Sequence, residues 1–434
     1  MVRRDAPCKS RGVDRPRGVS RRPPPRFPVW RRARYHGAVP GLEEELLTAA
    51  AWRQVTTRLG ELESLVMEAD VPDSPRDRAE GWRYVLRFLA ASIRCCIVAG
   101  DPDYPEFGRM IERGLAWGLD NPDCNYSITR VRGDAEYRVA GDAGTARHFE
   151  YQVNTGHFGD GNVGGWQTVS SIHAGELERD ADGRFEMILS AERQPGNWLR
   201  LDETASSFFL RQYFSDWENE RPARIFVERI GAEYPEPLLT PERLAPRIEE
   251  LLEWLTKGIR SWEAMSRLIL QTGANQVTLT EPMEGNAGLR GQAYGMGHFR
   301  CEEDEAVLIS FRPPACRMWS IQLCGWFWDS LDFATRQSSI NGAQAELDPD
   351  GIFRAVIAHQ DPGFANWVDP VGRTQGSLGI RYLFPDEVVQ PEFRVLPVSE
   401  LADVMPVDAV RVDPAERSRR LERRRRAVQL RYGY

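Results

Sequence analysis

The residues with the clearest capacity for chemistry stand at the end of one predicted strand, in the string His359-Gln360-Asp361. An imidazole beside a carboxylate can act as a general base, with Asp361 fixing the tautomer of His359. Residues i and i+2 of a strand share a face but stand several ångströms apart, so this spacing does not favour a direct bond between them. We assign His359 and Asp361 as catalytic candidates, with a histidine that only closes a turn as the alternative.

Aromatic and polar residues that could bind a ligand surround this pair in the sequence. An aromatic face can stack on a sugar or sterol ring, while amide, carboxylate and guanidinium groups bond its hydroxyls. Loops at one end of a sandwich commonly carry such residues. The alternative is that the aromatic residues fill a core and a sheet edge. The ligand-binding candidates are Trp319, Trp326, Trp328, Arg336, Asn341, Gln344, Asn366 and Asp369.

Several classes of site find no support in the sequence. The six histidines show neither HxH nor HExxH spacing, and the seven cysteines include no CxxC pair. The Gly-rich stretch 155–166 lacks the lysine of a phosphate-binding loop, and no GxSxG motif is present. We therefore expect no metal ligand and no cofactor.

The elements that must position these residues follow from a weak internal repeat with a period of about 170 residues. Self-similarity at such a long period indicates that one unit was used twice. Shared positions are expected to be structural, such as the Asp182-Gly183 and Asp350-Gly351 turns. Arg211 and Arg381 are expected to anchor buried hydrogen bonds. Matching positions in the two copies are Asp180 and Asp348, Asn197 and Asn366, and Arg211 and Arg381.

Short alternating runs with Gly-rich turns predict β-sandwiches or jelly rolls, and helical periodicity appears before and between them. The fold class is therefore mainly β with helical additions, built from two tandem antiparallel sandwiches. A short third helix is expected near 105–117 in the N-terminal helical element. The predicted segments are a disordered tail at 1–38, a helical element at 41–118, a sandwich at 119–235, a helical connector at 236–275, a second sandwich at 276–395 and a basic tail at 396–434.

Charge is segregated along the chain. Residues 1–34 carry a net +10 and residues 411–434 a net +6, so the segment between them carries −24 within a total of −8. An acidic body repels phosphate backbones, which argues against specific nucleic-acid binding. The basic C-terminal segment lacks a wide apolar face, so we expect a solvated helix that does not dock strongly. Without an apolar run of membrane length or a secretory signal, a cytoplasmic location is expected.

Four strings recur in an order that is similar to a known family. GLDNPDCNY (118–126), AYGMGHF (293–299), RQSSINGAQ (336–344) and DPGFANWVD (361–369) resemble the bacterial domain-of-unknown-function family twelve-fourteen. The resemblance covers roughly residues 80–395. It implies a tandem jelly roll, in agreement with the repeat, and it implies no catalytic residue.

Two functions from different classes fit these patterns. The first is binding of a carbohydrate-like or lipophilic small molecule or glycan in the second sandwich or between the two, with hydrolysis or elimination by general acid–base chemistry as the reaction. The second is a non-catalytic binding or scaffold protein that presents sandwich loops to a partner. Both are compatible with association of the chain into a homo-oligomer.

Overall fold

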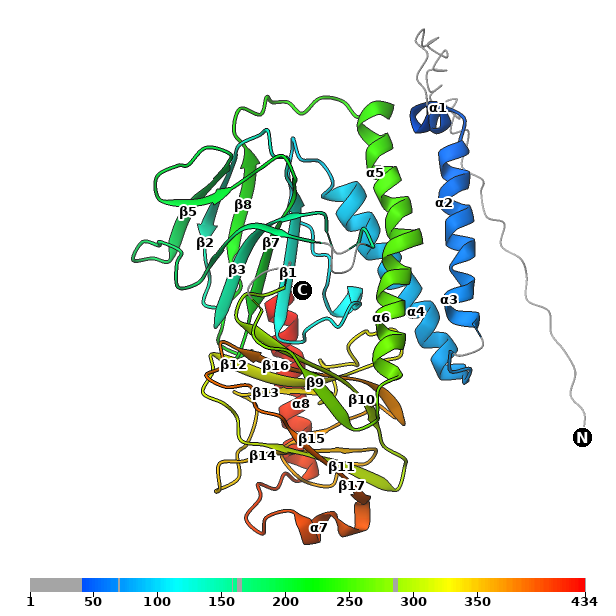
Figure 1. The fold of residues 1–434 in the computed structure, drawn as a ribbon, viewed down its shortest axis with the longest axis vertical. Coiled ribbons are helices and arrows are strands. Elements are labelled where there is room, and N and C mark those ends of the chain that lie inside the picture. Colours follow the sequence, from blue (N-terminus) through cyan, green and yellow to red (C-terminus); the bar gives the residue numbers. More distant parts are fainter. Residues whose placement is uncertain (1–40, 69–70, 158, 162–165, 284–287, 434) are drawn as a thin grey trace, which may run out of the picture. The chain divides into compact units, whose positions relative to one another are not determined.

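The alternating residues after position 123 form two stacked sheets in the computed structural model (Figure 1). The structure describes residues 41–68, 71–157, 159–161, 166–283 and 288–433, so the predicted tail at 1–38 lies outside it. One sheet has the order β1 (Cys124–Arg130), β7 (Ala205–Tyr213), β3 (His148–Thr155) and β4 (Thr168–His173). The other has the order β6 (Asn197–Arg200), β5 (Arg184–Ser190), β2 (Tyr137–Asp142) and β8 (Arg224–Arg229). Inward-facing residues of both sheets, such as Tyr151 and Met187, share one core.

The second β unit repeats this topology strand for strand. Its first sheet has the order β10 (Gln292–Arg300), β16 (Gln375–Leu383), β12 (Met318–Cys324) and β13 (Ser339–Asn341). Its second has the order β15 (Trp367–Val368), β14 (Phe353–Ala358), β11 (Glu305–Phe311) and β17 (Glu392–Pro397). A short strand, β9 (Gln276–Leu279), precedes it. The predicted mainly β fold with two tandem sandwiches is therefore confirmed.

One detail differs from a purely antiparallel sandwich, and it differs in the same way in both units. Strand β6 pairs with β5 in parallel, and β15 pairs with β14 in parallel. An Asn stands at the start of β6 and directly before β15, and in both units its side chain bonds two neighbouring backbone segments. The Asn197 side chain bonds the backbone of residues 178 and 186, and Asn366 bonds the backbone of residues 346 and 354 in the same pattern.

Helices cover one face of the first sandwich. Their apolar residues share a core with Ile128 and Phe209, which point out of the sheet formed by β1 and β7. Ser74 and Pro75 begin the longest of these helices as expected, since the Ser74 hydroxyl accepts the Asp77 amide. The helices are α1 (Leu42–Leu47), α2 (Ala50–Glu61), α3 (Glu63–Met67), α4 (Pro75–Ser92), η1 (Ile93–Val98), α5 (Pro241–Glu253), η3 (Trp254–Gly258) and α6 (Ile259–Leu270).

The helix expected near 105–117 does not form. This stretch contains a single 3₁₀ turn, η2 (Arg113–Leu115). Gly108 instead exchanges two backbone hydrogen bonds with Ile128 of β1, at 2.8 and 2.9 Å. Tertiary pairing with the sheet therefore takes the backbone groups that a helix would have used.

The basic C-terminal segment is the largest departure from expectation. It contains η4 (Val398–Glu400), α7 (Leu401–Val404) and the long helix α8 (Pro414–Tyr432), which is red in Figure 1. The prediction that it does not dock is wrong, because Arg417 and Arg431 are buried with Ala427, Val428 and Tyr432. The docked face of α8 thus combines buried arginines with a short apolar stretch near its C-terminal end.

Helix α8 joins the two β units through these arginines. Arg417 near its start contacts Asp361 at 2.9 Å and Gln337 at 3.0 Å, both from the second unit. Arg431 near its end donates to the carbonyl oxygen of Pro122, directly before the first unit, at 2.5 Å. Arg424 lies between them and donates to the Ser339 hydroxyl at 2.6 Å. Helix α8 thus bonds the second β unit and the segment that leads into the first.

The segment that precedes the first strand of each unit is hydrogen-bonded by the other unit. These segments are residues 118–120 and 288–290. Carbonyl oxygens of segment 118–120 accept from Arg381 and Gln322 of the second unit, at 2.7 and 2.8 Å. The carbonyl of Gly288 accepts from Gln152 of the first unit at 2.9 Å. Equivalent pairs support these hydrogen bonds, since Arg211 bonds Gln152 and Arg381 bonds Gln322. The predicted buried network around both arginines is confirmed.

Two carboxyl groups are buried at this joint. Asp120 accepts from the Ser330 amide at 2.7 Å and from its hydroxyl at 2.6 Å, and Asp329 lies 3.8 Å from the Arg87 guanidinium. Burial is the main cause that raises the pKa of both Asp120 and Asp329 to about 6. Each ionised carboxylate therefore costs folding free energy at neutral pH.

Replacing Arg417 with Ala is expected to lower the free energy of unfolding by about 3 kcal/mol, because Asp361 and two carbonyl oxygens lose their buried donor. Chemical denaturation measures this change. Arg425→Ala, on an exposed part of the same helix, serves as the control and should change stability by less than about 0.5 kcal/mol. Equal unfolding free energies for the two variants would show that α8 is not held by its buried arginines.

Replacing Asp329 with Asn should change the pH dependence of stability in a defined direction. The folded pKa of Asp329 lies above its ordinary 3.8, so this group's contribution to stability decreases as pH rises from about 4 to about 6. Asn cannot titrate, so relative to the native chain the variant should be about 1 kcal/mol more stable at pH 7 than at pH 5. Denaturation at both pH values tests this, and a pH-independent difference would contradict it.

Candidate functional site

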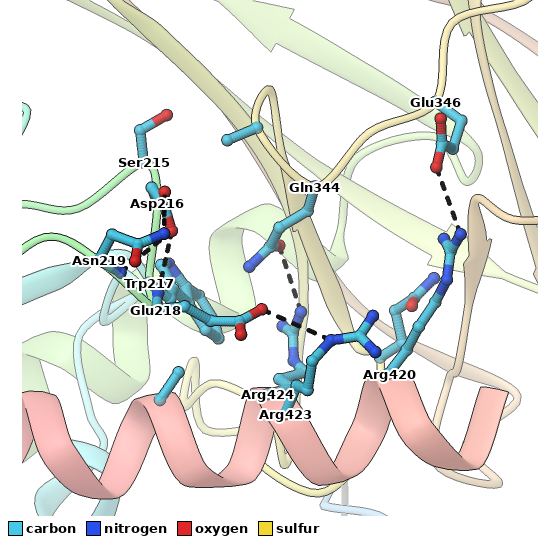
Figure 2. A pocket seen from close by; sticks show the side chains of 13 residues that line it. Ser215, Asp216, Trp217, Glu218, Asn219, Gln344, Glu346, Arg420, Arg423 and Arg424 are labelled. Atoms are coloured by element: carbon cyan, nitrogen blue, oxygen red, sulfur yellow. Dashed lines mark hydrogen bonds and ion pairs between the residues drawn. The ribbon is translucent and has the colours of Figure 1, made fainter. Parts of the chain in front are cut away.

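A cleft of about 480 Å³ lies where loops of both β units meet helix α8 (Figure 2). The first unit supplies loop 215–219, which follows β7, and the second supplies residues 337–346 around β13. Few of the lining groups are apolar. The lining residues are Ser215, Asp216, Trp217, Glu218, Asn219, Gln337, Ala343, Gln344, Glu346, Arg420, Arg423, Arg424 and Ala427.

Loop 215–219 is shaped by its own hydrogen bonds. The Asp216 carboxylate accepts from the backbone amides of Glu218 and Asn219 at 3.1 and 3.2 Å, and from the Asn219 side chain at 2.8 Å. An Asp that bonds the amides of following residues forms a tight turn. The Ser215 amide bonds Glu220 at 2.7 Å. The loop is thereby fixed with its carboxylate and amide groups facing the cleft.

Arg424 forms part of the floor of the cleft, and all of its guanidinium nitrogens donate hydrogen bonds. It donates to the Ser339 hydroxyl and carbonyl, to the Gln344 side chain at 3.2 Å and to the carbonyl of Phe333. Its guanidinium also lies 4.4 Å from the centre of the Trp217 ring. Burial lowers the pKa of Arg424 to about 9, which leaves it charged at neutral pH. Its role is to hold Gln344 and Trp217 in place.

Arg420 and Arg423 stand at the edge of the cleft with looser contacts. Arg423 is 46% exposed and lies 3.6 Å from both Glu218 and Glu416. Arg420 lies 3.3 Å from Glu346 and 3.1 Å from Glu416. Charge-assisted bonds of good geometry are shorter, at about 2.7–2.9 Å. These two guanidinium groups can therefore exchange part of their bonding for an incoming anion.

Among the ligand-binding candidates, Gln344 lines this cleft and Asn341 lies behind it. The Gln344 carbonyl accepts from Arg424 and from the backbone amide of Asn341. Asn341 is fully buried and bonds the Asp123 carboxylate at 2.6 Å and the Ser215 carbonyl at 3.1 Å. Burial raises the pKa of Asp123, while the bond from Asn341 opposes the shift. Asn341 thus ties loop 215–219 to the second unit.

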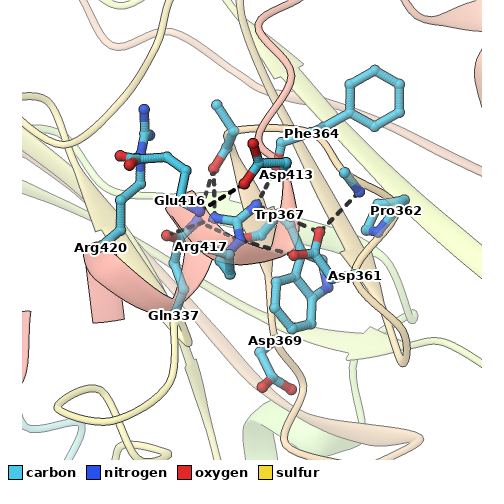
Figure 3. Close-up of polar contacts among 12 residues, drawn as sticks. Gln337, Asp361, Pro362, Phe364, Trp367, Asp369, Asp413, Glu416, Arg417 and Arg420 are labelled. Carbon is cyan, nitrogen blue, oxygen red and sulfur yellow. Dashed lines mark hydrogen bonds and ion pairs between the residues drawn. The ribbon is translucent and has the colours of Figure 1, made fainter. Parts of the chain in front are cut away.

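The catalytic candidates do not bond each other in this structure, because Asp361 bonds Arg417 of α8 (Figure 3) and His359 bonds a backbone carbonyl. His359 bonds the carbonyl oxygen of Cys301 at 2.9 Å through Nε2. Asp361 accepts from Arg417 at 2.9 Å and from the amide of Gly363 at 2.9 Å. Both contacts suit a structural role, with Asp361 anchoring α8. Neither residue lines the cleft.

The three tryptophan candidates lie in separate places. Trp319 is buried against Phe311 and Phe353 in the second core. Trp328 is 4% exposed, adopts a φ of 63° and contacts Trp262 of the helical element. Trp326 lines a smaller crevice of about 150 Å³ beside the start of α4. They do not converge on one aromatic surface.

The remaining ligand-binding candidates, Arg336, Asn366 and Asp369, lie in the second unit outside the cleft. Arg336 pairs with the buried Asp369 at 2.8 Å, and Asp369 also accepts the Val371 amide at 2.7 Å. Asn366 uses its side chain on the backbone of neighbouring segments, as Asn197 does in the first unit. The structure therefore brings Gln344 and Asn341 to the site and leaves the other candidates elsewhere.

The cleft residues that sequence reasoning missed come from loop 215–219 and from α8. One signal in the sequence could have found the helix. Arg417, Arg424 and Arg431 are spaced seven residues apart and therefore share one helical face. Asp413 and Pro414 before them form a typical helix start, and the Asp413 side chain accepts the Glu416 amide at 2.7 Å. Loop 215–219 carries no comparable signal.

The arrangement of side chains and helices also bears on metal binding and membrane insertion. Within the described residues, no group of three His, Cys, Asp or Glu side chains is arranged to hold a metal ion. In the same part of the chain, every helix is too short or too polar to cross a membrane.

Known structures support this fold without adding an activity. The crystal structure of an uncharacterized protein from Burkholderia cenocepacia is 27% identical, with a TM-score of 0.78. The match covers 83% of this chain and all of the other. The VPA0106 protein from Vibrio parahaemolyticus is 12% identical over 73% of this chain and 98% of its own, but its TM-score of 0.37 is too low to support an argument. No curated protein matches the sequence.

A family model locates the resemblance more narrowly than the motifs do. Residues 127–216 match the model described as "Protein of unknown function (DUF1214)". The matched span begins in β1 and ends in loop 215–219, so it covers most of the first sandwich. The resemblance drawn from the sequence is thereby confirmed, over a span that lies within the first β unit.

Proposed function

We propose that this chain is a binding protein for a small carbohydrate-like molecule that carries a carboxylate, such as a sugar acid, and that the cleft between the β units and α8 is its site. The single observation that supports this most is the convergence of both loops and α8 on one polar cleft of about 480 Å³. Ligand sites of small molecules commonly have volumes of about 300–1,000 Å³. A monosaccharide or disaccharide fits this range.

The chemistry of the lining favours a hydroxylated ligand over a lipophilic one. Carboxylates of Asp216, Glu218 and Glu346 accept hydrogen bonds from hydroxyl groups, and the Asn219 amide can both donate and accept. The apolar side chains in the lining are few, and both Arg424 and Arg431 lie over the Trp217 ring. Hydrogen bonds rather than ring stacking would therefore hold the sugar.

The two looser arginines favour an acidic group on that ligand. A guanidinium presents paired donors that match a carboxylate, and Arg423 is half-exposed with contacts of 3.6 Å to its present partners. A ligand carboxylate could take up these donors while Glu218 turns to a sugar hydroxyl. Arg420, with its longest contact to Glu346, is placed to assist.

Binding without catalysis is the form of function that we favour. The residues expected to act as general base are engaged elsewhere, His359 with a backbone carbonyl and Asp361 with Arg417. Acid–base catalysis requires a group within hydrogen-bond reach of the reacting atom. The chain would therefore act as a non-catalytic binding protein, with loops 215–219 and 337–346 as its binding loops.

Isothermal titration of the full chain with glucuronate should give saturable binding that is weaker for glucose, which lacks the carboxylate. Replacing Arg423 with Gln should weaken glucuronate binding about tenfold, the effect of losing one charge-assisted bond of about 1.5 kcal/mol. Arg425→Gln removes the same charge from an exposed part of α8 outside the lining and should bind normally. Equal affinity of both variants, or no binding of glucuronate, galacturonate or gluconate, would refute the proposal.

A further inference from the structure

A second concave feature lies where equivalent residues of the two β units meet. Arg147 directly precedes β3 and Arg317 directly precedes β12, at a spacing of 170 residues. The Arg147 side chain donates to the carbonyl oxygen of Arg317 at 3.2 Å. Residues at the same position of two copies touch where the copies are related by a local two-fold axis. An open hollow of about 500 Å³ lies there, lined by Arg147, Ala315, Cys316, Arg317 and Phe384.

The charge of this hollow is unbalanced. Within the part of the chain that the structure describes, neither Arg147 nor Arg317 forms an ion pair with a carboxylate. Arg290 of the same joint differs, because it pairs with Glu176 at 2.7 Å. Two guanidinium groups thus face one hollow with no acidic residue in its lining.

Two acidic residues, Glu220 and Asp386, stand near the hollow but do not line it. The Glu220 carboxylate accepts the Ser215 amide at 2.7 Å and a backbone hydrogen bond from Arg147, and it does not line the hollow. Asp386 is close enough to contribute to the raised pKa of Cys316, although burial is the larger cause. That pKa is about 11, so the thiol is neutral at physiological pH and adds no negative charge. The lining itself therefore holds two guanidinium groups and no acidic side chain.

Arg317 is held in position by two contacts. Its guanidinium bonds Nδ1 of His148 at 2.9 Å and lies 4.9 Å from the centre of the Phe384 ring. His148 is fully buried, and burial is the main cause that lowers its pKa to about 3, so it is neutral and accepts this bond. The arrangement orients Arg317 without using its charge on an anion of the protein.

We propose that Arg147 and Arg317 together bind a small oxyanion, a phosphate or carboxylate group, at the local two-fold axis between the β units. Arginine forks match the oxygen atoms of both groups, and two such forks from equivalent positions can grip one anion from either side. Two guanidinium groups in a lining without acidic side chains raise the local concentration of anions. The ring of Phe384 gives the hollow one apolar wall. This inference is independent of the cleft beside α8.

Titration calorimetry of the full chain with inorganic phosphate and with acetate tests the site, and glucose 6-phosphate distinguishes a free anion from a phosphate ester. Saturable phosphate binding is expected, and Arg147→Gln should weaken it about tenfold, because one of the two charged donors is lost. Arg147 is exposed, so this variant should fold normally. Arg317→Lys should weaken binding less than Arg317→Gln, because lysine retains the charge and loses the fork.

Arg312 provides the matched control. It is an exposed arginine on the same connection between β11 and β12, outside the hollow. Arg312→Gln removes the same charge and should leave phosphate affinity unchanged. The proposal is overturned if none of the three anions binds, or if Arg147→Gln binds phosphate as tightly as Arg312→Gln does.

Discussion

The structure depends on how three arginines of one helix are bonded, two of them buried and the third, Arg424, partly buried. A guanidinium group inside a protein must be given hydrogen-bond acceptors, since an unpaired buried charge costs several kcal/mol. Arg417 and Arg424 find these acceptors in a carboxylate and in carbonyl oxygens, whereas Arg431 donates to one carbonyl oxygen and lies against the rings of Phe214 and Trp217. Because such acceptors have fixed positions, satisfying them fixes the loops. The wall of the polar cleft is a consequence of this bonding.

Duplication explains why so many buried polar groups find partners. The same Arg–Gln pair occurs in both units, as Arg211 with Gln152 and as Arg381 with Gln322. The Gln of each pair bonds the segment that precedes the first strand of the other unit. The same symmetry brings Arg147 against Arg317. Residues shared by both copies are therefore of two kinds. Those inside one unit stabilise the sandwich, whereas those at the local axis meet each other and can form a surface that a single copy lacks.

The part of the site that could be predicted is small. Sequence reasoning concentrated on the second unit because His359 and Asp361 stand there opposite Ala191 and Arg193 of the first. It reached Gln344, which lines the cleft, and Asn341, which ties loop 215–219 to it. Asp361 was predicted to orient His359, but its side-chain partner in the structure is an arginine of α8. A pattern within one strand contains no record of a helix that docks from the other end of the chain.

The sequence by itself determined the elements that depend on local periodicity and turns: the two β units, the helices between and before them, and the Asp-Gly turns, where Gly183 and Gly351 have φ values of 80° and 76°. Tertiary structure alone decided what covers each sheet and where each charged side chain ends. A stretch such as 105–117 lost its helix to pairing with β1, and the arginine face of α8 became an interior face. The physical reason is that backbone periodicity is set by neighbours along the chain, whereas desolvation of a charge is paid back only by acceptors that the fold brings from far away.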